Sequence, residues 1–190
     1  MAFSILPLPT LFDRFLAGDE ERLSRGNFVV ITMDDGSNCD FLDSGAFRSM
    51  NSMLRDFVLR RGSTVGDRHL ATSFVVASPD ARRPGVRDDF WWRECVKEFL
   101  IAIESHSWDH CQPNVHPVAQ KDQIKGTFRY VETYEDADVQ FRKSREYIES
   151  VTHSACRYFA YPWGERNAYL TDQYLPLFQN EHRYIGCVTT

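Results

Sequence analysis

Two segments of the sequence carry side chains that can bind a metal ion. Asp34 and Asp35 stand directly before Gly36, and two neighbouring carboxylates repel each other unless a cation or hydrogen bonds offset their charge. His106 and His110 are four residues apart, so on a helical turn both imidazoles can reach one ion at about 2.0–2.1 Å. One carboxylate with two imidazoles is an ordinary ligand set of hydrolytic metal sites, because it leaves positions open for water and substrate.

Each segment also has a simpler interpretation. Asp35-Gly36 is a common turn pair, and His106 and His110 can be a helix-cap residue and a surface residue that never meet. The presence of both segments in one chain, each directly after an apolar run, favours a shared metal site.

A third segment, residues 159–164, has the sequence Phe-Ala-Tyr-Pro-Trp-Gly. Pro162 has no backbone N–H, and Gly164 permits a sharp turn. This pattern leaves the N–H of Trp163 free to point into a cleft, where it can stabilise an oxyanion. The alternative is an aromatic turn that packs on the core.

The three segments follow apolar runs that are typical of buried strands. Residues 28–31 form a continuous apolar run rich in β-branched side chains, as expected of a strand buried on both faces of a parallel sheet. Similar runs occupy residues 71–77, 100–103, 158–161 and 184–188. Functional groups of such folds gather at the carboxyl ends of the strands. Two long polar connections, residues 78–89 and 110–126, are of the kind that shape a binding cleft.

Helical patterns separate the strands. The clearest helix begins at Thr133, a plausible N-cap with Asp136 three residues on. Its buried stripe consists of Tyr134, Ala137, Phe141, Ile148 and Val151. A second helical pattern, with apolar residues on one face, covers residues 44–58. A weaker one covers residues 91–99, and another helix is expected after Asn167. The alternation predicts an α/β fold with parallel strands, either a barrel or a doubly wound sheet.

The composition excludes several classes of protein. The chain has 190 residues, about one domain, and 43% of them are hydrophobic. A net charge of −5 without a run of Lys or Arg argues against binding to nucleic acid. The five scattered cysteines include no Cys-x-x-Cys pair, which argues against a zinc ribbon or a dithiol redox motif.

The sequence also predicts no association with a membrane. No stretch approaches the roughly 18 apolar residues of a membrane span, and the first 16 residues lack the basic start of a signal peptide. We therefore expect a cytoplasmic protein, although an export signal removed beforehand would leave the same sequence.

The three segments together resemble the motifs of a known family. Asp34-Asp35-Gly36 after Thr32 resembles the TFDDG motif of the polysaccharide deacetylases, the NodB-homology or carbohydrate esterase family 4 group. The segment from His106 to His110 matches the H(S/T)xxH motif, and residues 159–164 are similar to FAYPYG. Framework residues 71–76 and 186–190 also resemble strands of that family, so the resemblance covers residues 28–190. We expect residues 1–190 to form one domain, with residues 1–27 as an N-terminal extension packed on it.

The resemblance implies a deformed (β/α) barrel with one divalent metal ion, often zinc. Asp35, His106 and His110 would be the metal ligands, Asp34 would be the general base, and the N–H of Trp163 would stabilise the developing negative charge. The implied reaction is hydrolysis of a C–N amide bond that removes an N-acyl group, most simply acetyl, from an amino sugar.

The resemblance also suggests supporting residues. Tyr161, Pro162 and Trp108 are candidate substrate contacts. Four aromatic side chains near the motifs can stack on a sugar, although burial in the core explains them equally well: Trp91, Trp92, Trp108 and Trp163. Ser107 is expected to support the metal loop rather than act as a nucleophile, because no partner base is apparent in the sequence.

The match is incomplete at several positions. Ala160 stands where the family often has an arginine, and Arg157 is the nearest substitute for orienting Asp34. Glu104 is an unexplained charge beside the histidine motif. The family's last motif, whose histidine protonates the leaving group, is expected after Thr190. Four further histidines, His69, His116, His153 and His182, have no matching context.

These departures leave alternatives open. About five strands are predicted, so the barrel is either incomplete or closed by a partner chain in a homo-oligomer. The substrate can be a small amide or ureide instead of a carbohydrate, which suits a cytoplasmic location. The protein can also be a catalytically degenerate carbohydrate-binding module, which the missing histidine favours and the four intact motif residues oppose.

Overall fold

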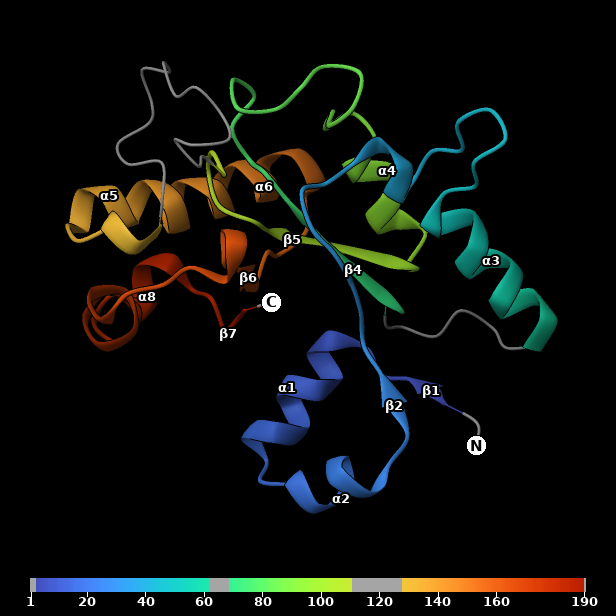
Figure 1. Ribbon diagram of the computed structural model, residues 1–190, viewed down its shortest axis with the longest axis horizontal. Coiled ribbons are helices and arrows are strands. Elements are labelled where there is room, and N and C mark those ends of the chain that lie inside the picture. The colour runs from blue at the N-terminus through green and yellow to red at the C-terminus, as the bar shows by residue number, and fades with distance from the viewer. Residues whose placement is uncertain (1–2, 62–68, 111–127, 190) are drawn as a thin grey trace.

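A five-stranded parallel sheet forms the centre of the protein (Figure 1). The computed structural model describes residues 3–61, 69–110 and 128–189. The strand order is β3-β4-β5-β6-β7, and each neighbouring pair is parallel. The strands are β3 (Ile31–Met33), β4 (Ala71–Val75), β5 (Ile101–Ser105), β6 (Tyr158–Ala160) and β7 (Gly186–Val188). Sheet and helices form the deformed, incomplete (β/α) barrel that the sequence predicts.

Helices connect the strands, and a second small sheet pairs β1 (Ser4–Ile5) with β2 (Phe28–Val29). The helices are α1 (Leu8–Leu16), α2 (Glu20–Arg25), α3 (Met50–Arg61), α4 (Trp92–Lys97), α5 (Tyr134–Asp138), α6 (Ser144–Thr152), α7 (Leu175–Leu177) and α8 (Gln179–His182). Tight 3-10 turns occupy Asn38–Asp40, Phe128–Tyr130 and Pro162–Gly164, and π-helical turns occupy Val139–Lys143 and Leu170–Tyr174. Within the described ranges, no helix combines the length and apolar character that crossing a membrane requires.

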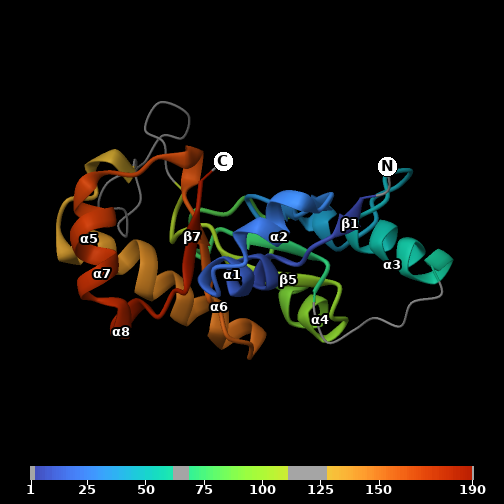
Figure 2. The same cartoon turned by 90° about the horizontal axis from the view of Figure 1, so that it is seen from below.

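The two faces of the sheet have different partners. Side chains alternate between the faces of a strand, and Val75 and Phe159 belong to the main core with Trp92 of α4 and Phe141. On the other face, Phe74 and Tyr158 pack with Leu8 of α1, and the ring of Phe12 stacks on Tyr158 at 5.0 Å between centroids. Figures 1 and 2 show α4 and α6 on one side of the sheet and α1 on the other.

The helix predicted from Thr133 is confirmed. The Thr133 side chain caps α5 by accepting a hydrogen bond from the N–H of Asp136 at 3.2 Å. A π-helical turn, Val139–Lys143, then joins α5 to α6. Ala137, Phe141 and Ile148 of the predicted stripe are fully buried against the sheet.

The prediction of one doubly buried strand at residues 28–31 is wrong. The run divides between two sheets, because β2 ends at Val29 and β3 begins at Ile31. Val29 is 40% exposed, and β3 is an edge strand with β4 as its one neighbour in the sheet. An edge strand is shielded on fewer sides than a central one, in line with the exposure of Thr32 and Asp34.

Glu104 links two strands. Its buried carboxylate accepts hydrogen bonds from the N–H groups of Arg157 at 2.7 Å and Tyr158 at 2.8 Å. The backbone pairing of β5 with β6 is short, with Ser105 opposite Phe159. The Glu104 carboxylate adds two hydrogen bonds between these strands. Burial raises the pKa of Glu104 to about 7, and the two N–H groups oppose that rise. The charge that the sequence leaves unexplained is therefore a connection between β5 and β6.

Candidate metal centre

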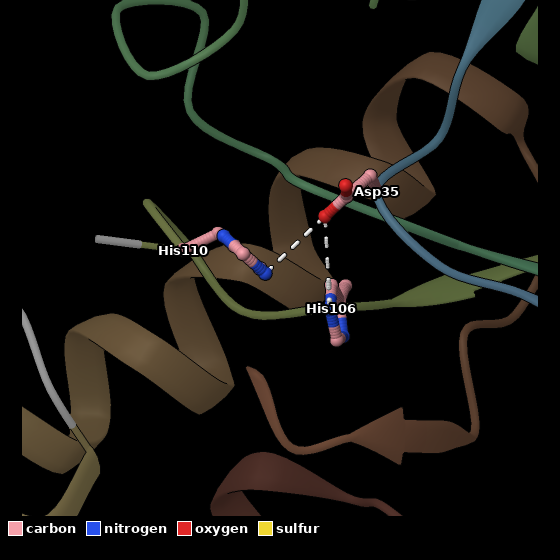
Figure 3. A group of neighbouring side chains, drawn as sticks. All are labelled: Asp35, His106 and His110. Atoms are coloured by element: carbon pink, nitrogen blue, oxygen red, sulfur yellow. Dashed lines mark ion pairs between the residues drawn. The ribbon is translucent and has the colours of Figure 1, made fainter. Parts of the chain in front are cut away.

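Three side chains from two strand ends meet at one point. Asp35 follows β3, whereas His106 and His110 follow β5. The Oδ1 atom of Asp35 lies 3.2 Å from Nε2 of His110 and 3.9 Å from Nε2 of His106 (Figure 3). One ligand atom from each residue lies within 4.8 Å of the other two. The sequence prediction that these three residues come together is therefore confirmed as geometry.

The backbone turns sharply to present Asp35. Asp35 has a φ of 76° and Gly36 a φ of 68°, both in the left-handed region. Aspartate tolerates this region better than most residues, because its short polar side chain can bond locally. A Cβ atom on Gly36 would lie 2.7 Å from Cγ1 of Val75, so no larger residue fits there without a shift of β4. The Asp-Gly pair thus forms a turn that directs the Asp35 carboxylate toward the two histidines.

The predicted helical turn at residues 106–110 is wrong, although its two histidines do meet. Ser107 and His110 have φ values of 77° and 47°, so the segment is an irregular loop. Ser107 donates its N–H to Oγ of Ser105 at 3.2 Å, and the Ser107 Oγ accepts the N–H of His110 at 3.0 Å. Buried hydroxyl groups replace the helical hydrogen bonds. Ser107 therefore supports the histidine loop, in line with its expected role.

One histidine is held in a defined tautomer. The Nδ1 atom of His106 lies 2.9 Å from the carbonyl oxygen of Ala160, at the end of β6. Because a carbonyl oxygen only accepts, Nδ1 carries the proton and Nε2 keeps its lone pair directed toward Asp35. Burial lowers the pKa of His106 and His110, and their mutual repulsion lowers that of His110 further. Both shifts favour the neutral ring, the state in which imidazole binds a metal ion.

The donor set fits a divalent cation. Metal–ligand bonds of about 2.0–2.1 Å place the donors of a tetrahedral zinc ion about 3.4 Å apart. The separations of 3.2 and 3.9 Å from Asp35 lie close to that value, and all three ligand atoms lie within 4.8 Å of one another. Nδ1 of His110 is buried, and within residues 3–61, 69–110 and 128–189 it has no hydrogen-bond partner.

A pocket of about 200 Å³ opens above the three side chains, lined by Asp34, Asp35, His106, His110 and Trp163. Loss of hydration and the charge of Asp35 raise the pKa of Asp34, while His110 lowers it. Trp163 is 55% exposed, and its ring centroid lies 5.9 Å from that of His110. The pocket combines the three candidate metal ligands, the carboxylate of Asp34 and the exposed Trp163.

The turn at Trp163 has the predicted shape. Gly164 donates its N–H to the carbonyl oxygen of Tyr161 at 2.9 Å, and Glu165 donates to that of Pro162 at 3.0 Å. Trp163 itself has a φ of 58°. Stabilisation of an oxyanion by the Trp163 N–H stays a prediction.

Other predicted site residues are not among those that line the pocket. Arg157 precedes β6, at the end of the strand opposite to Tyr161 and Pro162, and the structure does not bring it to Asp34. Tyr161 and Pro162 are buried, and Trp108 is buried with Nζ of Lys143 3.8 Å from its ring centroid. Their burial matches the core interpretation, and contact with substrate stays a prediction.

The remaining histidines do not join the pocket in the described part of the chain. His182 is buried, with Nε2 2.9 Å from the carbonyl oxygen of Leu175 and Nδ1 accepting the N–H of Tyr184. His69 stacks on Phe99, before β4. His153 is exposed at the end of α6, and His116 lies outside the described residues.

Arg87 is a site residue that sequence reasoning missed. Its Nη2 donates to Oδ2 of Asp35 at 2.7 Å. Arg87 belongs to the polar connection 78–89 that the sequence marks as shaping a cleft, but no spacing rule links it to Asp35. The neighbouring connection, residues 110–126, lies outside the described residues from residue 111 onward.

Comparison with known proteins identifies similar chains. A family model described as polysaccharide deacetylase matches residues 67–175, more than half of the chain. The match includes both histidines and residues 159–164, whereas Asp34 and Asp35 precede it. No curated protein matches.

Two solved structures share the fold. IcaB from Ammonifex degensii is 19% identical with a TM-score of 0.60, and the alignment covers 92% of this chain and 65% of that one. The Streptococcus pyogenes deacetylase PplD, in complex with acetate, is 13% identical with a TM-score of 0.57, and the coverage is 95% and 63%. The chain therefore spans less than two thirds of the length of either protein.

Proposed function

Because the chain belongs to the polysaccharide deacetylase family, we propose that it is a metal-dependent hydrolase that removes an N-acyl group from an amino sugar. In this proposal Asp35, His106 and His110 hold one divalent cation, with zinc preferred for two imidazoles and a carboxylate. The observation that carries the proposal is the approach of one Asp35 oxygen to Nε2 of both histidines, at 3.2 and 3.9 Å.

The residues around the pocket have distinct proposed roles. A bound divalent cation lowers the pKa of water and polarises a carbonyl group. Asp34 accepts the proton of the attacking water, and its raised pKa brings it closer to the range in which a general base works well at neutral pH. The N–H of Trp163 donates to the oxygen on which negative charge develops.

The shape of the pocket supports a carbohydrate substrate with a small acyl group. A volume of about 200 Å³ suits the acyl group, while the exposed indole of Trp163 offers a face on which a sugar ring can stack. Acetyl is the acyl group we favour, since PplD is described as a deacetylase in complex with acetate.

A metal analysis combined with a substrate screen tests the proposal. Purified protein is expected to contain or take up one zinc ion per chain and to release acetate from N-acetylated sugar oligomers. Cleavage of small amides or ureides alone would overturn the substrate class. Zinc binding without hydrolysis of any of these substrates would instead identify a catalytically degenerate binding module.

A further inference from the structure

The two oxygens of the Asp35 carboxylate have different partners. Oδ1 faces the two histidines, whereas Oδ2 accepts the 2.7 Å hydrogen bond from Arg87. We propose that Arg87 is a positioning residue, which occupies Oδ2 so that Asp35 presents a single oxygen to the metal ion. This inference rests on the proposed function, because it assigns a role to Arg87 within the same metal centre.

Asn38 holds the Arg87 loop against the Asp35 turn. Its N–H donates to the carbonyl oxygen of Val86 at 2.7 Å. Its side-chain amide accepts the N–H of Asp88 at 2.8 Å and donates to a carboxylate oxygen of Asp88 at 2.8 Å. Both neighbours of Arg87 in the chain are therefore bonded to one residue that stands three positions after Asp35. The indole N–H of Trp91 adds a fourth bond to Asn38, at 3.0 Å.

The hydrogen bonds of Asn38 and Arg87 limit the movement of the Arg87 and Asp35 side chains. The side chains of Arg87 and Asp35 are 24% and 34% exposed, so neither is fully free in solvent. A charge-assisted hydrogen bond in such a setting is stronger than one between neutral groups. The hydrogen bond from Arg87 fixes the rotation of the Asp35 carboxylate. Hydrogen bonds to a metal ligand commonly change metal affinity by about 10–100-fold.

Orientation and charge act in opposite directions at this site. The positive charge of Arg87 repels a dication, whereas its hydrogen bond orients the ligand. Arg87 contacts the oxygen that faces away from the histidines, and its side chain reaches solvent, which screens the repulsion. We therefore expect orientation to dominate, so that removal of Arg87 weakens metal binding.

Zinc affinity of the full chain, measured by competition with a chromophoric chelator, tests the proposal. Arg87→Met is expected to weaken zinc binding about 10–100-fold, and Arg87→Lys, which lacks the planar fork, is expected to weaken it less. Asn38→Ala changes no charge and is expected to weaken binding in the same direction. Arg83→Met is the matched control, since Arg83 is exposed in the same loop and is expected to leave affinity unchanged.

The absorption spectrum of the Co²⁺-substituted protein gives a second readout of ligand geometry. A changed spectrum in Arg87→Met and Asn38→Ala, but not in Arg83→Met, is the expected result. Unchanged or tighter zinc binding in Arg87→Met would overturn the positioning role, whatever the result for Asn38→Ala. If Arg87→Met does not fold, Arg87→Lys and Asn38→Ala decide by the same criterion.

Failure of this inference differs from failure of the proposed function. If the natural sequence binds no zinc, or keeps its zinc after His106→Ala, the metal centre itself is wrong. If His106→Ala abolishes binding while the Arg87 and Asn38 variants bind normally, only the positioning role is lost.

Discussion

The Nδ1–H of His106 points at the carbonyl oxygen of Ala160, 2.9 Å away, and so connects the loop after β5 to the last residue of β6. The acceptor is a backbone carbonyl group, so residue 160 can orient His106 whatever its side chain is. An arginine at this position is not needed for that role. It also means that the geometry of the proposed metal centre depends on the pairing of these two strands.

Substitution of the proposed ligands and of the proposed base should have separable effects. Asp35→Ala and His106→Ala are expected to abolish zinc binding, because each removes a donor. Asp34→Asn is expected to retain zinc and to lower turnover about 100-fold to 10,000-fold, the usual contribution of a general base. Zinc content by mass spectrometry and acetate release are measured on the same samples. Undiminished zinc in both ligand variants would contradict the assignment.

Ser107→Ala should destabilise the protein. The substitution leaves the N–H of His110 without the hydroxyl that accepts it at 3.0 Å, in a buried loop. A buried donor without a partner costs about 1–3 kcal/mol of the free energy of unfolding, which urea denaturation measures. Ser150→Ala, at an exposed position of α6, is the control and should change stability by less than about 0.5 kcal/mol. Equal effects of the two substitutions would show that the Ser107 hydroxyl does not support the loop.

Asp40 should make the metal-free protein less stable as pH rises. Burial raises its pKa from 3.8 to about 6, with further increases from Asp35 and Asp34, against the 2.6 Å hydrogen bond from Ser73. Below pH 3.8 the carboxyl is protonated in both states and carries no penalty. Between pH 4 and 6 the unfolded chain loses its proton first, so folding becomes less favourable, by about 3 kcal/mol in all above pH 6.

Asp40→Asn removes this titration while keeping an oxygen for Ser73. In the presence of a chelator, the variant is expected to exceed the natural sequence in stability at pH 7.5 and to differ little from it at pH 4. Urea denaturation at the two pH values measures the difference. The opposite ordering, with the larger gain at pH 4, would show that the carboxylate is stabilised in the folded protein.

His182→Ala should lower stability without changing turnover. Both ring nitrogens bond to backbone groups in the interior, so the ring lacks access to a leaving group. Loss of these bonds and of the stacking on Tyr184 is expected to cost about 2–4 kcal/mol. Turnover per folded molecule, measured at a temperature where the variant remains folded, should be unaffected. A large fall in turnover would make His182 the proton donor to the leaving group.

The sequence predicts the centre of this fold and the meeting of its three donors. Asp35, His106 and His110 follow apolar runs, and parallel strands bring their carboxyl ends to one edge of the sheet. The shape of the histidine loop was not predictable from spacing, because the hydroxyls of Ser105 and Ser107 replace helical bonds. The prediction of one buried strand at residues 28–31 failed for a related reason. An apolar run does not show whether a strand has one neighbour in the sheet or two.

The arginine beside Asp35 was beyond prediction for a different reason. The position of Arg87 depends on the amide of Asn38, which bonds to residues about fifty positions away in the chain. Neither the residue types nor their local spacing carry that information. It emerges only when the loops after β3 and β4 are folded against each other.

The placement of α1 on the face of the sheet opposite to α4 and α6 has a practical consequence for engineering the protein. Leu8 and Phe12 cover Phe74 and Tyr158, so this helix shields apolar surface that a closed barrel would bury among its own strands. A truncated protein that begins after β2 lacks α1 and would expose that apolar surface to solvent. Such a shortened protein should aggregate on expression, even though it retains all the proposed metal ligands.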